Sequence, residues 1–161
     1  MTPGNKVTVS VTVDTDPATA FLLFTQETDL WWRRGPKFRI AGRNPGVIRF
    51  EPRLGGSLTE SFDGQNFPTG TITAWNPPSS FQFEWRAVNF APGESTTVHV
   101  SFEPVPSGTR VTVHHAGWAS LRPDHPVRHG QPAPAFLRSM GLWWGDLMTS
   151  LRELAASKNP N

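Results

Sequence analysis

The chain of 161 residues contains no cysteine and no tyrosine. Without cysteine it has no disulfide bonds, thiolate nucleophiles or thiolate metal ligands, and its composition suits a reducing compartment. Residues 1–6 include no apolar segment of the kind found in signal peptides. No apolar run approaches the ~20 residues that cross a membrane. The sequence therefore predicts a soluble, cytoplasmic protein that does not engage membranes.

The chain also has only a small excess of positive over negative charge. The formal net charge is +2, and Lys and Arg are scattered along the chain without a basic run. Proteins that bind a phosphate backbone concentrate positive charge on one face or along one helix. We therefore expect no nucleic-acid partner. The length predicts one domain over residues 1–161, large enough to bury a core of its own.

Sequence motifs for nucleophilic catalysis and nucleotide binding are absent as well. There is no G-x-S-x-G elbow and no compelling Ser/His/Asp set. Gly55-Gly56 lies between two predicted strands instead of opening a helix, so it predicts a turn and not a phosphate cradle. We expect no cofactor.

What the chain has in abundance is aromatic side chains, with seven Trp and eleven Phe. Several lie in the last long periodic segment, 136–154, where the apolar residues form one continuous arc on a 3.6-residue helix. The arc consists of Phe136, Leu137, Met140, Trp143, Trp144, Leu147, Met148, Leu151 and Leu154. Pro134 suits a first helical turn. A helix from Pro134 to Ser157 would be about 35 Å long and needs a broad apolar surface to lie against.

Alternating residues and turn signals predict an antiparallel sheet before that helix. The predicted strands are 6–13, 47–51, 57–63, 69–76, 80–88, 95–103 and 109–117. Two short helices are expected after the first strand, one opened by Asp16-Pro17 and one capped by Thr28, followed by a long loop over 33–46. A second long loop is expected over 119–134. The class is α+β, with a curved sheet of seven strands around one long C-terminal helix.

Residue parity within the strands separates an apolar face from a solvated one. The apolar face carries Leu58, Glu60, Phe62, Phe81, Phe83, Trp85, Val98, Val100, Phe102, Val111, Val113 and His115. A seven-stranded sheet is about 33 Å wide at ~4.8 Å per strand, whereas one helix is only ~10 Å across. The sheet must therefore curl around the helix. A curved sheet closed by a straight helix favours a hollow between them, which is the usual place for a small-molecule site.

Several short segments carry a resemblance to a known family. They include Asp16-Pro17-Ala18, Asp29-Leu30-Trp31-Trp32, Leu54-Gly55-Gly56, Trp75-Asn76-Pro77-Pro78, His115-Ala116-Gly117-Trp118 and Trp143-Trp144. In this order and spacing, the chain resembles the START-like (SRPBCC) superfamily. Within it, the chain is similar to the branch of homologues of the activator of heat-shock-protein-90 ATPase. The resemblance implies a helix-grip, Bet v 1-like fold. The superfamily includes carriers of hydrophobic ligands, polyketide cyclases and co-chaperone domains.

The hollow predicts a set of ligand-binding residues on the inner face and the helix. They are Glu60, Phe62, Phe83, Trp85, Val100, Val113, His115, Met140, Trp143 and Trp144. Glu60 and His115 are ionisable, so they could orient a ligand or act on its carbonyl group as acid and base. The structural alternatives are a satisfied polar pair, or a Glu60 bonded to an arginine of loop 33–46.

Two further features concern a metal site and a close backbone contact. His99 and His114 are expected to face each other on the solvated side if Glu103 opposes Arg110, but no third ligand is evident, so we expect no metal site. Gly141 and Gly145 in the final helix would let another element, or a ligand, approach the backbone closely. The same small residues also allow a contact between two copies of the chain, and therefore a homodimer.

The sequence leads to three functional hypotheses. The sequence favours a binding protein over an enzyme, holding a hydrophobic or aromatic small molecule between the sheet and the last helix. The first alternative is an enzyme of cyclase or hydrolase type that uses Glu60 and His115. The second is a co-chaperone-like protein-interaction domain.

Overall fold

The protein is described by a computed structural model covering residues 6–39, 41–86, 90–118, 121, 125–128 and 130–158. Its elements in chain order are β1 (Lys6–Val13), α1 (Pro17–Gln26), α2 (Thr28–Trp31), β2 (Val47–Phe50), β3 (Ser57–Phe62), β4 (Gln65–Asn76), β5 (Ser80–Trp85), β6 (Thr96–Val105), β7 (Gly108–Ala116), a 3₁₀ turn η2 (Pro126–Arg128) and α3 (Ala133–Lys158). Within this part of the chain, no helix is both long enough and apolar enough to cross a membrane.

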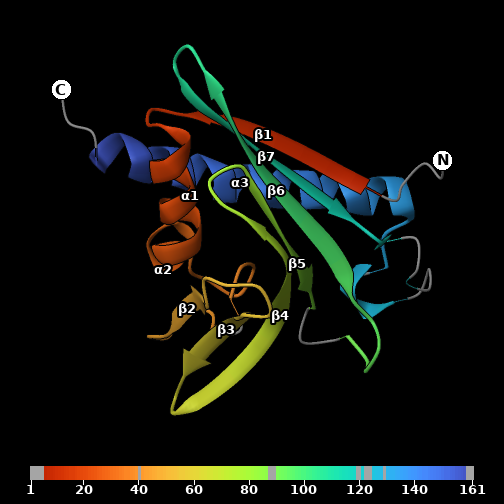
Figure 1. Cartoon of the computed structure of the whole chain (residues 1–161). Helices are drawn as coiled ribbons and strands as arrows, with labels where there is room; N and C mark the ends of the chain where they lie inside the picture. Colours follow the sequence, from red (N-terminus) through yellow and green to blue (C-terminus); the bar gives the residue numbers. More distant parts are fainter. Residues whose placement is uncertain are drawn as a thin grey trace.

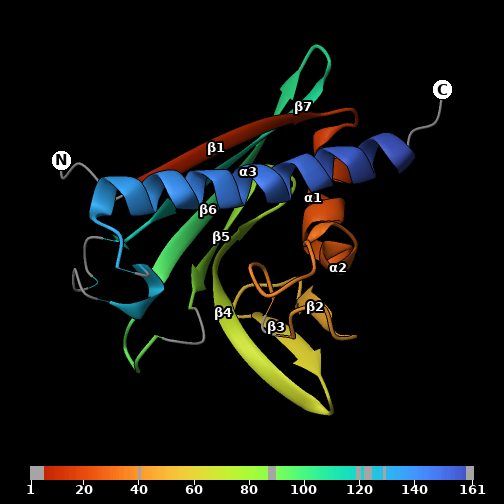
Figure 2. The same cartoon turned by 180° about the vertical axis from the view of Figure 1, so that it is seen from behind.

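One curved, wholly antiparallel sheet holds all seven strands, in the order β1-β7-β6-β5-β4-β3-β2. Figure 1 shows α3 crossing behind the sheet, and Figure 2 shows it in front when the molecule is turned round. In both views β1 runs beside α3, while β2, β3 and β4 curve away below it and α1 and α2 stand at one end. This arrangement confirms the predicted helix-grip architecture.

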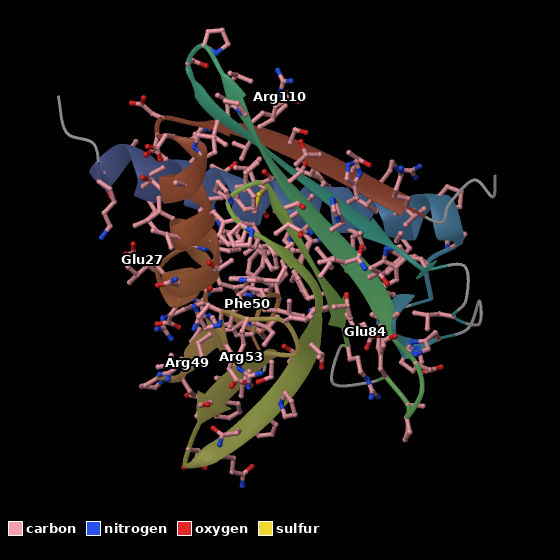
Figure 3. All side chains as sticks on the ribbon, in the orientation of Figure 1. Glu27, Arg49, Phe50, Arg53, Glu84 and Arg110 are labelled. Atoms are coloured by element: carbon pink, nitrogen blue, oxygen red, sulfur yellow. The ribbon has the colours of Figure 1, made fainter. Side chains whose placement is uncertain are left out.

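The strands alternate between buried and exposed positions as predicted. Phe81, Phe83, Val100 and Val113 on the inner face are fully buried, whereas exposed or half-exposed polar side chains occupy the outer face. Figure 3 shows Phe50 among the dense side chains inside the curve, with Arg49 and Arg53 near the outer edge of that region. The inner face and the apolar arc of α3 together form one core.

Two strand boundaries differ from the prediction because of tight turns. Asp63 and Gly64 have φ angles of 53° and 74°, so they make a two-residue turn that lets β4 begin at Gln65 and not at residue 69. Pro68 is accommodated inside β4 by an irregularity in its pairing with β3. Likewise, β6 continues to Val105, which pairs with Gly108 across a two-residue turn. The predicted end of β5 at residue 88 lies outside the described residues.

The predicted first helix is confirmed, but the predicted cap of the second is wrong. Asp16 caps α1 by accepting a hydrogen bond from the Thr19 backbone N–H at 2.7 Å. Thr28 is the first residue of α2, and its hydroxyl instead donates to the Phe24 carbonyl at 2.7 Å. The hydroxyl turns back because α1 leaves that carbonyl at its C-terminal end, so α1 and α2 join closely.

Alanine substitutions at two glycines test how closely other atoms approach the backbone of the sheet and of α3. A Cβ atom at Gly70 would lie 2.1 Å from the Glu84 carbonyl oxygen, whereas one at Gly145 in α3 would have nothing within 4 Å. Gly70→Ala is expected to lower the free energy of unfolding by about 1–3 kcal/mol through overpacking. Gly145→Ala is expected to raise it by up to about 1 kcal/mol, because alanine favours a helix. Urea unfolding measures both, and equal effects would contradict these contacts.

Candidate functional site

A hollow lies between the sheet and the N-terminal half of α3. It is a cavity of about 620 Å³. Its walls come from loop 33–46 and the residue before it, from β2 to β5, and from η2 and α3. The described lining residues are Trp32, 36–39, Ile48, Glu60, Thr69, Trp85, Arg86, Val127, Gln131, Phe136, Ser139, Met140 and Trp143.

The cavity occupies only one half of the space beneath α3, because α1 fills the other half. Phe21 and Phe24 of α1 pack against Phe81 and Phe102, with ring centroids 5.0–5.8 Å apart. In the C-terminal half of α3, Leu147, Met148, Leu151 and Ala155 are also fully or almost fully buried. The hollow therefore remains only where no helix lies between the sheet and α3.

Four of the ten predicted site residues line the cavity: Glu60, Trp85, Met140 and Trp143. The other six are Phe62, Phe83, Val100, Val113, His115 and Trp144, which lie outside the lining. Phe83, Val100, Val113 and Trp144 are fully buried in the packed core. Phe62 sits near the end of the β3–β4 hairpin, where its ring stacks on Phe67 at 4.9 Å.

Loop 33–46 closes one side of the cavity and is fastened to α3. The Trp143 indole N–H donates to the Lys37 carbonyl at 2.8 Å, and the Phe38 ring stacks on Trp143 with centroids 5.8 Å apart. One turn later, Asp146 accepts from Arg33 through its carbonyl at 2.9 Å, and its carboxylate lies 3.6 Å from the Lys37 ammonium. The loop is thus held over the cavity by both polar and aromatic contacts.

An ion pair between a buried arginine and a partly exposed aspartate also anchors this loop. The Arg39 side chain is fully buried, and its guanidinium donates to the Asp29 carboxylate at 2.6 Å. Its other N–H groups reach the carbonyls of Asp29, Trp32 and Arg33. The same Asp29 oxygen accepts from the Ile48 N–H at 3.0 Å. Asp29 therefore connects α2, the loop and the edge strand β2.

Glu60 brings a carboxylate to the cavity from β3. The residue is 2% exposed, and its Oε2 accepts from the Ala41 backbone N–H at 2.7 Å. One of the structural alternatives joined Glu60 to an arginine of loop 33–46. Of the loop's arginines, Arg39 pairs with Asp29, and Glu60 meets the loop through the Ala41 backbone N–H.

His115 has a different environment from Glu60 despite sharing its face of the sheet. The Trp144 indole, which can only donate, gives its N–H to His115 Nδ1 at 3.0 Å. Nε2 therefore carries the ring proton and donates to the Thr96 hydroxyl at 2.7 Å, which in turn donates to the Trp85 carbonyl at 3.1 Å. Both ring nitrogens are used inside the protein, so Glu60 and His115 do not form an acid–base pair in one pocket.

The outer face shows the predicted histidine pairing. His99 opposes His114, and Glu103 opposes Arg110, so the register is confirmed. The imidazole centroids lie 6.4 Å apart, and the Thr8 hydroxyl is 3.0 Å from His114 Nδ1. Among the described residues, no group of three or more His, Asp or Glu is placed to hold a metal ion.

Several lining residues were not predicted. Trp32, Phe38 and Phe136 line the cavity but are not among the predicted site residues. Periodicity could not place the loop against α3, because the loop has no regular repeat. The available signal was an aromatic side chain within a Gly- and Pro-rich loop, since a large apolar group there needs a packing partner.

The sealed position of His115 predicts a pH-dependent stability. Burial lowers the pKa of His115 from 6.5 to about 3. Between these pH values the unfolded chain binds the extra proton, so this residue should reduce stability by about 1.4 kcal/mol per unit fall in pH. Its contribution should level off below pH ~3. Urea unfolding from pH 7 to 4 measures the slope. His115→Gln should remove this component, and His99→Gln on the outer face should keep it; the same slope in both variants would contradict the assignment.

Comparison with solved structures shows what this fold is similar to. Protein MLL2253 from Mesorhizobium loti aligns at a TM-score of 0.67 and 17% identity, covering 97% of this chain and 99% of that one. The Aha1 dimer from Colwellia psychrerythraea aligns at 0.63 and 15%, covering 92% and 93%. PFC0360w from Plasmodium falciparum, described as an HSP90 activator, aligns at 0.64 and 16%, covering 93% and 95%.

At these identities the solved structures establish the fold alone. No curated protein matches the sequence. The family model described as "Activator of Hsp90 ATPase homolog 1-like protein" matches residues 14–154, from the residue after β1 to the last turns of α3. This match confirms the resemblance drawn from the sequence, and the chain belongs to the family of activator of Hsp90 ATPase homolog 1-like proteins.

Proposed function

We propose that this chain, as one domain over residues 1–161, binds a hydrophobic or aromatic small molecule in the cavity beneath the N-terminal half of α3. The observation that carries the proposal is the unfilled volume of about 620 Å³ in a core that is otherwise closely packed. Ligand sites in proteins commonly enclose about 300–1,000 Å³. The cavity is therefore large enough for a molecule of several rings.

The walls favour flat, apolar ligands. Trp32, Trp85 and Trp143 line the cavity together with Phe38 and Phe136. Burial of apolar surface contributes roughly 25 cal/mol per Å². A ligand that buries about 300 Å² therefore gains about 7 kcal/mol, before the loss of its translational freedom is subtracted. This balance favours binding in the micromolar range or weaker unless polar groups of the ligand are also matched.

Filling the cavity with a new side chain tests this proposal. Ser139 lines the cavity, whereas Arg138, one residue earlier on α3, is exposed. Fatty acids, sterols and aromatic polyketides are screened by thermal shift and by tryptophan fluorescence. A ligand of the native protein should lose at least about tenfold in affinity with Ser139→Phe, which places a ring in the hollow. Arg138→Phe adds the same ring outside and should bind as the native protein does. No response from any compound, or equal binding by the two variants, would refute cavity binding.

A second candidate is a protein-interaction role, favoured by the family match and by the description of the Plasmodium falciparum protein as an HSP90 activator. Leu22 on α1 and Leu30 on α2 are 49% and 61% exposed, so apolar surface is present on these helices. If this role is correct, the chain should stimulate the ATPase of an HSP90 chaperone, and Leu30→Asp should reduce the stimulation. An unchanged ATPase rate at saturating protein would exclude it.

A further inference from the structure

The cationic residues among the described lining of the cavity are Lys37, Arg39 and Arg86. Two of them are already paired with aspartates. The fully buried Arg39 guanidinium donates to the Asp29 carboxylate at 2.6 Å and to backbone carbonyls through its other nitrogens. The Lys37 side chain is 61% exposed, and its ammonium lies 3.6 Å from the Asp146 carboxylate. An exposed, paired ammonium of this kind contributes little further attraction.

Arg86 is the cation that has no such partner. It is half-buried and follows β5 directly, where its backbone N–H donates to the Thr69 carbonyl at 2.7 Å. Its Nη2 donates to the carbonyls of Ala91 at 2.7 Å and Phe90 at 3.3 Å. No ion pair within the described part of the chain includes Arg86. A guanidinium has five N–H donors, so Nε and Nη1 keep donors for a further acceptor.

The aromatic wall of the cavity begins at the residue before Arg86. The Trp85 ring lines the cavity, with its centroid 6.1 Å from that of Trp143 and 5.7 Å from that of Phe90. The carbonyls of Phe90 and Ala91 hold the Arg86 guanidinium at this same end of the sheet. A positive charge therefore lies next to flat apolar surface, and the two together match a ligand that carries an anion on a ring system.

Glu60, the anionic residue of the described lining, lies on a different strand from Arg86. Glu60 is on β3 and pairs with Phe67 of β4, whereas Arg86 follows β5 on the other side of β4. Two strand spacings put the two backbones about 10 Å apart. The Glu60 carboxylate accepts from the Ala41 N–H of loop 33–46 at 2.7 Å. Since salt screens exposed charges over about this distance, Glu60 should repel an anion at Arg86 only weakly.

From this arrangement we infer that the ligand is an aromatic or polycyclic carboxylic acid, bound as its anion with the carboxylate at Arg86 and the rings against Trp85 and Trp143. The inference rests on the proposed binding function and specifies its ligand class. A carboxylic acid is ionised at pH 7. Hydrogen bonds in which donor and acceptor are charged are about twice as strong as neutral ones, so the anion should be preferred over a neutral ligand with the same rings.

Three probes with one ring system and different charge test this inference: 2-naphthoate, 2-naphthylmethanol and 2-naphthylmethylamine. Affinities for the full chain are measured by calorimetry at pH 7. The anion is expected to bind at least about tenfold more tightly than the neutral alcohol, in line with a charge-assisted hydrogen bond. The cationic amine should bind most weakly of the three.

Arg86→Gln identifies the group responsible for this order. Glutamine removes the charge but keeps an amide that can donate to a carbonyl. Binding of 2-naphthoate should fall to the level of the alcohol, and binding of the alcohol should be unchanged. Arg110→Gln is the matched control, because it removes the same charge from a side chain that is 52% exposed on β7, away from the enclosed side chains (Figure 3). It should leave the preference intact, as should Lys37→Gln.

Arg86→Lys keeps the test decisive if the glutamine variant folds poorly. Lysine retains the positive charge and can still donate to a backbone carbonyl. This variant should therefore bind the alcohol as the native protein does and still prefer 2-naphthoate over it. Loss of the preference in Arg86→Lys would overturn the assignment of the anion to this position.

The remaining outcomes separate the two proposals. If the alcohol binds but 2-naphthoate is not preferred, or if Arg86→Gln keeps the preference, the inferred ligand class is overturned while the binding function stands. The same holds if the amine binds most tightly, or if Lys37→Gln removes the preference. If none of the three probes binds at millimolar concentration, and the wider screen also fails, both proposals are wrong.

Discussion

A single helix has to cover the inner face of a seven-stranded sheet, and much of the molecule follows from this mismatch in width. The sheet curls around α3, but α3 crosses only its upper part in Figure 2, and β2, β3 and β4 curve away below the helix. At one end α1 supplies Phe21 and Phe24, which complete the core. At the other end no helix intervenes, and the cavity remains. The position of the hollow is therefore set by where the short helices lie.

Closing that hollow depends on polar contacts made by an irregular segment. Loop 33–46 has no repeating hydrogen-bond pattern. Some of its carbonyl groups, such as those of Gly35 and Gly42, accept from the loop's own backbone, and others accept from side chains. Arg39 donates to the Arg33 carbonyl while pairing with Asp29, and Trp143 donates to the Lys37 carbonyl. These bonds hold the loop over the cavity and use the indole N–H of Trp143 and N–H groups of Arg39, both of which line it. The stability of the loop and the polarity of the cavity thus have one cause.

Glu60 and His115 show how one face of one sheet can give two chemistries. His115 lies where Trp85, Trp118 and Trp144 surround it, with ring centroids 4.4–5.9 Å away. There the imidazole is neutral and its hydrogen bonds join the helix to the sheet. Glu60 lies on β3 and lines the cavity, where its Oε2 accepts from the Ala41 backbone N–H at 2.7 Å. The same face of the sheet thus supplies one polar group that joins the sheet to α3 and another that joins it to loop 33–46.

The sequence by itself determined the α+β class, the strand order along the chain, the two faces of the sheet and the long apolar arc of the last helix. These follow from local periodicity, which the backbone geometry of strands and helices imposes on neighbouring residues. It also placed Glu60, Trp85, Met140 and Trp143 near a hollow. Only the tertiary structure decided that Phe83, Val100 and Val113 are packed solid while Trp32, Phe38 and Phe136 line the cavity. Such a choice depends on how far the sheet curls and where an aperiodic loop is anchored, and both are set by contacts between residues far apart in the chain.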